Sequence, residues 1–338
     1  MSSPNVAVIG ATGAVGQVAL QILEERAFPM NSLRLCASPS SVGKKITFRG
    51  VEIEVETPTE SLFKDTDIAF IAAGSSLSKI YAPLAASLDC IAIDKSSAFR
   101  MDPKVPLVVP EINANDIWAH EGIISVPNCS TTQMVMALSP LHDVNPIRRV
   151  VVDTYQSVSG TGKAAMEELQ VQSSQILEGL PIKPEAYPHQ IAFNALPQVE
   201  TFLDDGYTTE ERKMRDETRK ILHSDSINIS ATCVRIPVPI SHSEALHIEF
   251  EKPMSPSEAR SLLSSFSGAT VLDDPFDSKY PLASSATGRD DVFVGRIRAD
   301  DSHPNGLVMW VVSDNLRKGA ATNGIQIAEE IINKDHSA

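Results

Sequence analysis

A cysteine stands between an asparagine and a run of hydroxyl residues in the segment SVPNCSTTQMVM (125–136). Cys129 follows the strand-like run IISV and precedes apolar residues at helical spacing, which predicts a helix starting here with Ser130 or Thr131 as its cap. The positive helix end and its unpaired N–H groups favour a thiolate. The pattern therefore predicts a nucleophilic cysteine, and the same N–H groups could hold an oxyanion.

A cysteine that works through a thioester needs a proton acceptor, and the segment RIPVPISHSEALHIEF offers two histidines. His242, flanked by serines in a predicted polar turn before the strand ALHIEF, is the better candidate for a general base near neutral pH. His247, inside that strand, is interpreted as structural. Isolated histidines in polar loops are common, so the local pattern leaves a structural role for His242 open.

The first half of the chain supplies elements that could position a cofactor. Strand-like runs alternate there with helix-like or turn-rich segments, which favours a parallel sheet with helices on its faces. The first run, NVAVIG, leads into Gly10, Gly13 and Gly16, spaced G-x-x-G-x-x-G. This is a variant of the fingerprint that rests a pyrophosphate on a helix start, with a simple tight turn as the alternative.

The end of the second predicted strand bears on the choice of cofactor. Rossmann domains that bind NAD usually have an acidic residue there for the ribose hydroxyl. This chain has CASPSSVGKK, which contains no Asp or Glu. Hydroxyls and cations suit a 2′-phosphate, so NADP is favoured over NAD. A solvated polar loop is the alternative interpretation of the same residues.

Length, charge and cysteine usage narrow the class of protein. The 338 residues suit two domains, and the net charge of −14, from 43 acidic and 29 basic residues, argues against nucleic-acid or anionic-membrane binding. Without a leader or membrane-spanning run, we expect a cytoplasmic protein with reduced thiols. No cysteine or histidine cluster has metal spacing, so no metal is expected. Cys36, Cys90 and Cys233 are interpreted as inert core.

Six segments together resemble a known family. They are GATGAVG, IDKSSAFR, VPNCSTTQ, VDTYQSVSGTGK, RIPVPISHSEAL and SDNLRKGAATNGIQIAE, in the order and spacing of aspartate-semialdehyde dehydrogenases. The resemblance spans nearly the whole chain. It implies NADPH-dependent conversion of L-aspartyl-4-phosphate to aspartate semialdehyde and phosphate, on the route to lysine, threonine and methionine. It also implies that Cys129 becomes acylated, that His242 is the acid/base, and that Gln156 positions the acyl group.

Substrate anchors are implied in the same way. Arg100 and Lys213 resemble the phosphate-site cations, with Asn128 close by; Arg235 resembles the residue that grips the substrate carboxylate, and Glu210 the one that holds its ammonium. Residues alone would make Glu210 and Lys213 an exposed helix pair three positions apart.

Cofactor contacts implied by the resemblance lie in both halves of the chain. One departure concerns Ser40, because many relatives carry an arginine there that would grip the 2′-phosphate. Either Lys44 or Lys45 compensates, or NAD is accepted as well. The implied contacts are Gly10, Thr12, Gly13, Ala14, Val15, Ser40, Ser41, Ser159, Gly160 and Asn315.

The expected architecture is an α/β protein with a discontinuous Rossmann-type NADP-binding domain (1–128 and 315–338) and an α+β catalytic and dimerisation domain (129–314) with a mixed sheet. The family forms homodimers, and a tetramer is a further option. A closely related alternative is N-acetyl-gamma-glutamyl-phosphate reductase, against which Glu210 argues. An alternative of another class is a non-catalytic NADP-binding sensor. The proline-rich stretch EGLPIKPEAYPHQIAFNALPQVETF is expected to be irregular.

Overall fold

The chain forms two compact units in the computed structural model, which describes residues 3–335. Unit 1 comprises Met1–Asn128 and Ala320–Ala338, and unit 2 comprises Cys129–Gly319. The chain thus leaves unit 1 at Asn128 and re-enters it at Ala320. The second segment of the dinucleotide-binding domain was expected to begin at residue 315.

Seven strands build the sheet of unit 1: β1 Asn5–Ile9, β2 Ser32–Cys36, β3 Lys45–Phe48, β4 Val51–Glu56, β5 Ile68–Ile71, β6 Ile91–Asp94 and β7 Ile123–Ser125. Their order is β3-β4-β2-β1-β5-β6-β7, and all neighbours are parallel except β3 and β4. Apart from β3, each strand coincides with one of the predicted strand-like runs NVAVIG, LRLCAS, VEIEVE, DIAFIAAG, CIAIDKSS and GIISVPN. The order confirms the Rossmann-type fold class.

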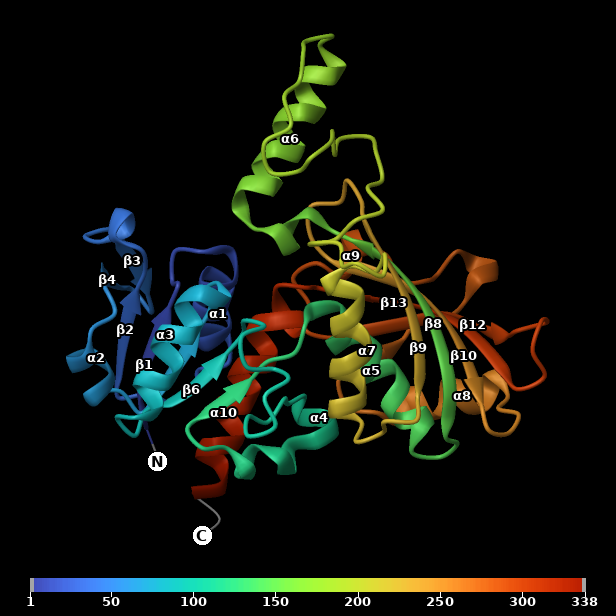
Figure 1. The fold of residues 1–338 in the computed structure, drawn as a ribbon, viewed down its shortest axis with the longest axis horizontal. Coiled ribbons are helices and arrows are strands. Elements are labelled where there is room, and N and C mark those ends of the chain that lie inside the picture. The colour runs from blue at the N-terminus through green and yellow to red at the C-terminus, as the bar shows by residue number, and fades with distance from the viewer. Residues whose placement is uncertain (1–2, 336–338) are drawn as a thin grey trace. The chain divides into compact units, whose positions relative to one another are not determined.

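Helices cover both faces of this sheet, as Figure 1 shows. Alternate residues of β1 enter different cores: Val6 and Val8 pack with α1 and α10, and Ala7 and Ile9 pack with α2 and α3. This two-sided burial explains why the strands are continuous apolar runs. The helices are α1 Ala14–Glu25, α2 Glu60–Lys64, α3 Ser75–Ala86, α4 Pro110–Asn113 and α10 Thr322–Asp335, with 3₁₀ turns η1 Pro39–Ser41 and η2 Ala114–Ala119.

Unit 2 contains a second sheet of six strands: β8 Ile147–Gln156, β9 Asn228–Arg235, β10 His242–Phe250, β11 Ala269–Val271, β12 Val292–Ala299 and β13 Gly306–Ser313. Their order is β11-β12-β13-β10-β8-β9. The pairs β8–β9 and β11–β12 are parallel and the other pairs antiparallel, which confirms the mixed sheet.

Helices of unit 2 pack against this sheet, chiefly α5, α7 and α8. After β13, the chain passes through a π-helical turn, η5, into α10. The elements are α5 Cys129–His142, η3 Val158–Thr161, α6 Lys163–Leu177, α7 Thr209–Ile221, α8 Pro256–Ser265, η4 Pro275–Asp277, α9 Ala283–Ala286 and η5 Arg317–Ala321.

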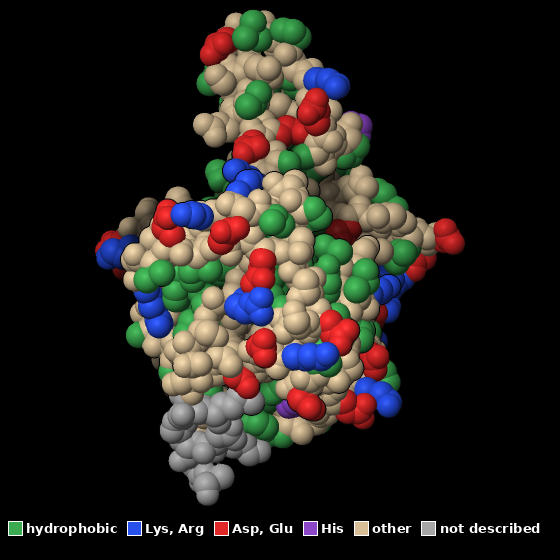
Figure 2. Space-filling view, turned by 90° about the vertical axis from the view of Figure 1, so that its left-hand side faces the viewer, with side chains coloured by type: hydrophobic (Ala, Val, Ile, Leu, Met, Phe, Trp, Pro, Cys, Tyr) green, Lys and Arg blue, Asp and Glu red, His purple; other side chains and the backbone are tan. Residues whose placement is uncertain are grey.

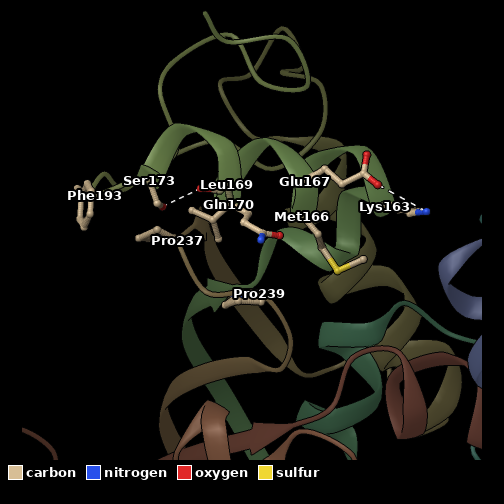
Figure 3. Close-up of a pocket in the computed structure, with 9 residues that line it drawn as sticks. All are labelled: Lys163, Met166, Glu167, Leu169, Gln170, Ser173, Phe193, Pro237 and Pro239. Carbon is tan, nitrogen blue, oxygen red and sulfur yellow. Dashed lines mark hydrogen bonds and ion pairs between the residues drawn. The ribbon is translucent and has the colours of Figure 1, made fainter. Parts of the chain in front are cut away.

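The helix α6 and the chain that follows it extend away from the sheet of unit 2 (Figure 1). The proline-rich stretch after α6 has no helix or regular strand, as predicted. A cavity of about 560 Å³ lies between α6 and residues 237–239, and Figure 3 shows Met166, Pro237 and Pro239 among its lining residues. None of the residues that line it was predicted as a site residue.

Charged side chains of both signs are interspersed on the face presented in Figure 2. The net charge of −14 is therefore not gathered into one acidic field on that face. Within residues 3–335, no helix is both long and apolar enough to span a bilayer.

Candidate active site

Cys129 is the first residue of α5, and its side chain is partly exposed at the start of an otherwise buried helix. The expected cap was wrong, because Ser130 and Thr131 lie inside the first turn and are fully buried. The hydroxyl of Ser130 turns inward and accepts a hydrogen bond from Gln156 Nε2 instead. Gly319 approaches from η5, where a Cβ would lie 2.9 Å from the Cβ of Cys129.

His242 meets Cys129 directly: its Nε2 lies 3.2 Å from the Cys129 sulfur. The expected polar turn was wrong, because His242 is the first residue of β10 and is only 1% exposed. Its other ring nitrogen, Nδ1, accepts the backbone N–H of Ser157 at 3.0 Å. The neighbouring His247 faces elsewhere, with Nδ1 3.6 Å from an Asp300 carboxylate oxygen.

Two adjacent rows of side chains cross the sheet of unit 2. Strand register pairs Gln156 with Arg235 and His242 with Ser313, and these residues end β8, β9 and β13 and begin β10. Two residues further into each strand, register pairs Cys233 with Thr154, Thr154 with Glu244, and Glu244 with Val311. Because alternate residues of a strand share a face, both rows point to the same side. We call Arg235, Gln156, His242 and Ser313 the outer row, and Cys233, Thr154, Glu244 and Val311 the inner row.

The outer row connects to α7 through Gln156. Its Nε2 donates to Glu210 Oε1 at 2.9 Å, and Glu210 Oε2 is 3.3 Å from Lys213 Nζ. Lys213 also pairs with Glu200. Glu210 is only 3% exposed, so the alternative of an exposed helix pair was wrong. Thr208 and Glu211 form a capping box that fixes this end of α7.

Two buried polar atoms of the outer row lack a hydrogen-bond partner among the described residues: Arg235 Nε and Gln156 Oε1. Arg235 is 5% exposed, and its Nη1 donates to the Ser157 carbonyl at 2.6 Å. Gly160 is adjacent, since a Cβ there would lie 3.0 Å from Arg235 Nη1 and 3.4 Å from His242 Nε2. An unpaired donor and an unpaired acceptor beside the thiol are what a polar ligand would satisfy.

Asn315 and Ser159, both expected at the cofactor, lie in a buried network behind His242. Asn315 Oδ1 accepts hydrogen bonds from Ser157 Oγ at 3.0 Å, Ser159 Oγ at 3.1 Å and the Ser241 N–H at 2.9 Å. The Asn315 amide nitrogen donates to Ser159 Oγ at 2.9 Å. This network fixes the segment from which Ser157 contacts the histidine.

The glycine turn of unit 1 fits a dinucleotide. Gly10 has a φ of +91°, and a Cβ there would lie 2.5 Å from the Ala72 carbonyl oxygen, so only glycine fits. Gly13 is the N-cap of α1 and makes no side-chain cap, and the first turn, with Ala14 and Val15, has no acidic residue. An anion can therefore approach this helix start. Thr12 Oγ1 lies 3.4 Å from Ser41 Oγ, which joins the turn to the end of β2.

The polar residues after β2 differ in their exposure and in their contacts with other side chains. Ser40 is exposed, and its hydroxyl is 3.0 Å from that of Ser38. Lys45 is engaged in an ion pair with Glu52 at 3.0 Å, whereas Lys44 is an exposed residue between η1 and β3. Of the two lysines expected to compensate for the missing arginine, Lys44 is the better placed.

Arg100 and Asn128 are both buried in unit 1, at 5% and 6% exposure. Arg100 Nε donates to the Val126 carbonyl at 2.9 Å, and its Nη2 donates to the Lys95 carbonyl at 2.7 Å. The guanidinium is thus held beside the segment that leads through Asn128 to Cys129. Among the described residues, no group of three or more His, Cys, Asp or Glu side chains could hold a metal ion.

The remaining cysteines are buried, as predicted. Burial raises the pKa of Cys36 and of Cys90 to about 12, and it raises the pKa of Cys233 well above its usual value. These thiols stay protonated and unreactive near neutral pH.

Three further residues at the site, Ser157, Gly319 and the fully buried Glu244, were not predicted from the sequence. All three lie in segments that carried the resemblance, but nothing in their local pattern gives them a role. Ser157 acts through its backbone N–H, which every residue except proline has. Its importance therefore depends on three-dimensional placement.

Comparison with known proteins shows the family. Residues 5–120 match the NAD binding domain of semialdehyde dehydrogenases, and residues 138–318 match their dimerisation domain. Aspartate-semialdehyde dehydrogenases of Aquifex aeolicus and Bacillus subtilis are 54% and 48% identical, each over 97% of both chains. The chain belongs to the aspartate-semialdehyde dehydrogenase family.

A solved structure of the same family supports the fold in detail. Aspartate semialdehyde dehydrogenase II from Vibrio cholerae, complexed with ASA, matches with a TM-score of 0.96 at 44% identity, over 98% of this chain and 99% of that one. The resemblance and the fold class expected from the sequence are thereby confirmed. The chain is an enzyme of this family, with a dinucleotide-binding domain and a domain through which the family assembles.

Proposed function

We propose that the chain catalyses the NADPH-dependent reductive dephosphorylation of L-aspartyl-4-phosphate to L-aspartate 4-semialdehyde, a step toward lysine, threonine and methionine. The observation that carries this proposal is the distance of 3.2 Å between His242 Nε2 and the Cys129 sulfur. Arg235 and Gln156 belong to the same outer row as His242. Family membership makes the reaction class plain, and the named relatives act as aspartate-semialdehyde dehydrogenases.

Covalent chemistry is assigned to Cys129. Its thiolate attacks the acyl carbon, a C–S bond forms, and the C–O bond to phosphate breaks. Arg100, Lys213 and Asn128 are proposed to hold the phosphate. Gln156 is proposed to position the acyl group, and its unpaired Oε1 and its place beside Ser130 support this role.

The substrate's amino-acid end is assigned to Arg235 and Glu210. The buried Arg235 Nε has no partner among the described residues, which suits a fork on a carboxylate. Glu210 is a buried acceptor that suits a free ammonium. An acetylated amine would offer it no positive charge, so the N-acetyl-gamma-glutamyl-phosphate alternative is not favoured.

NADPH supplies the hydride when it is bound. Residues proposed to hold it are Gly10, Thr12, Gly13, Ala14 and Val15 at the start of α1, Ser40 and Ser41 after β2, and Ser159, Gly160 and Asn315 of unit 2. The close glycine backbone at Gly10 and the uncapped start of α1 support this assignment. We propose residues 1–128 and 315–338 as the NADP-binding domain and residues 129–314 as the catalytic and dimerisation domain.

Assembly into a homodimer is also proposed, with a tetramer as the larger option. The match of residues 138–318 to a dimerisation domain supports a partner copy. The sheet of unit 2 carries Tyr155, 37% exposed, with its ring 5.3 Å from that of Trp310. A cytoplasmic location stays a prediction from the sequence. Light scattering of the purified protein distinguishes monomer, dimer and tetramer.

The reaction is tested in the oxidative direction, as phosphate-dependent formation of NADPH from L-aspartate 4-semialdehyde. We expect activity with NADP⁺ that requires phosphate, and a parallel assay with NAD⁺ measures the effect of Ser40. Protein that binds NADP⁺ but shows no turnover, with Cys129 unreactive toward alkylation, would support the sensor alternative instead.

A further inference from the structure

Both backbone groups of Ser157, its N–H and its carbonyl, are hydrogen-bonded to side chains of the site. Its backbone N–H donates to His242 Nδ1 at 3.0 Å, and its carbonyl accepts from Arg235 Nη1 at 2.6 Å. The next two N–H groups are also committed: Val158 donates to the Val238 carbonyl at 2.9 Å, and Ser159 donates to the Pro239 carbonyl at 3.1 Å. The direction of the Ser157 N–H is therefore fixed by the backbone.

This contact decides where the imidazole carries its proton. A backbone N–H can only donate, so it requires the lone pair of His242 Nδ1, whereas the Ser157 hydroxyl, 3.0 Å from the same nitrogen, can either donate or accept. A neutral imidazole protonated on one nitrogen then has its hydrogen on Nε2, the nitrogen 3.2 Å from the Cys129 sulfur. An imidazolium would place a second N–H at Nδ1, facing the Ser157 N–H, which is unfavourable.

Charged groups around the ring favour the same state. From β9, the Arg235 guanidinium flanks the small space at Gly160 that His242 also lines, and two cations there would repel each other. From α7, Glu210 and Lys213 are paired with each other. On β10 itself, burial raises the pKa of Glu244 well above its usual value, which disfavours a negative charge there that could balance an imidazolium.

We propose that Ser157 is a positioning residue that fixes His242 as a neutral imidazole protonated on Nε2, so that His242 serves Cys129 as a hydrogen-bond donor to the thiolate. The inference deepens the proposed function and rests on it for the reaction. Cys129 is then a thiolate stabilised by the start of α5 and by one N–H, rather than half of a thiolate–imidazolium pair.

The electron and proton balance is consistent with a donor that keeps its proton. When the thiolate adds to the acyl carbon, the electron pair of the broken C–O bond leaves with phosphate, which takes up the single proton of the overall reaction. After the thioester carbon has received the hydride from the nicotinamide cofactor, the C=O re-forms, the C–S bond breaks, and its electron pair returns to sulfur. Cys129 begins and ends as thiolate, so His242 needs to store no proton.

The direct test is nitrogen NMR of the full chain labelled with ¹⁵N-histidine and free of cofactor and substrate. The resonances of His242 are assigned by their absence from the His242→Gln variant. At about pH 7 we expect a protonated Nε2 and an unprotonated Nδ1. Protonation of both nitrogens, or of Nδ1 alone, would overturn the proposal.

A matched pair of variants tests the donor role at the thiol. His242→Gln can place an amide N–H near the position of Nε2, whereas His242→Asn reaches only the position of Nδ1. We expect the pH profile of Cys129 alkylation by iodoacetamide to stay near that of the wild type in His242→Gln. In His242→Asn it moves to higher pH, and the rate near neutrality falls about tenfold for each unit of that shift. Equal shifts in both variants would mean that the lost imidazolium charge mattered, which contradicts the proposal.

Ser157→Ala separates the backbone from the hydroxyl, because it keeps the N–H and removes only Oγ, which also lies 3.0 Å from Nδ1. We expect the Nε2–H form to persist in this variant. Its loss would show that the backbone contact does not hold the proton in place. None of these measurements uses substrate or cofactor, so failure of the inference is distinguishable from failure of the proposed reaction.

Discussion

The outer and inner rows of the unit 2 sheet lie two residues apart along each strand and differ in their surroundings. In the outer row, the His242 ring is hydrogen-bonded and lies beside a partly exposed thiol. In the inner row, Cys233 and Glu244 are fully buried, and burial raises the pKa of both well above the usual values.

The two rows therefore differ in their surroundings as well as in their residue types. The outer row lies where strands begin or end, beside helix starts and loop N–H groups that can pair with a ligand. The inner row is enclosed, with the Cys233 sulfur 3.7 Å from the Met214 sulfur, and an enclosed ionisable group becomes neutral. The following predictions test this contrast.

The largest expected effect separates the two thiols of unit 2. Cys129→Ala should abolish turnover while NADP⁺ binding remains, because no other group can form the thioester. The control Cys233→Ala should retain turnover and lose about 1 kcal/mol of unfolding free energy, the scale of one buried methylene-sized group. Steady-state assays and urea unfolding measure both. Turnover that survives Cys129→Ala would refute the thioester route.

Removing the imidazole is expected to have the next largest effect. His242→Asn should lower the rate by roughly two to four orders of magnitude, the usual effect of a positioned group at the reacting atoms. The control His247→Asn changes a histidine of the same strand that is paired with Asp300, and its rate should match the wild type. An unchanged pH–rate profile in His242→Asn would contradict both the acid/base role that the resemblance implies and the donor role inferred above.

Arg235→Lys sharpens the contrast further, since Arg235 lies only two residues beyond Cys233 on β9. Lysine keeps the charge but loses the fork and the contact to the Ser157 carbonyl. We expect KM for aspartate semialdehyde to rise roughly ten- to a hundredfold, the scale of a charged hydrogen bond. If KM is unchanged, the guanidinium does not grip the carboxylate.

The smallest effect on turnover is expected at Glu244, where the readout is stability against pH. Because its folded pKa is raised, the unfolded state releases a proton above about pH 4 that the folded state retains, so the unfolding free energy falls as pH increases. Glu244→Gln removes this loss, and its stability relative to the wild type should grow in urea unfolding as the pH rises from about 4 until the folded pKa of Glu244 is passed. A constant difference across that range would mean that Glu244 is ionised in the folded protein.

Strands with uniform apolar runs were predictable from the local pattern, whereas β12 and the N-terminal cap of α5 were not. β12 mixes apolar residues with Arg296 and Arg298, and its Gly295 is explained by the Leu272 carbonyl, 2.2 Å from where a Cβ would lie. The predicted cap of α5 was wrong because α5 begins at Cys129, and the Ser130 hydroxyl inside its first turn accepts a hydrogen bond from Gln156, which is 26 residues away. Competing tertiary contacts of this kind leave no local signal.

By itself, the sequence determined most of the strands, the glycine turn and the cysteine at a helix start, because each depends on neighbours within a few residues. Tertiary structure alone decided which polar groups meet. Cys129 and His242 are 113 residues apart, and Ser157 and Asn315 are 158 apart. Strand register across β8, β9, β10 and β13 brings such residues to one end of a sheet, and a slip of one residue would turn every side chain to the other face.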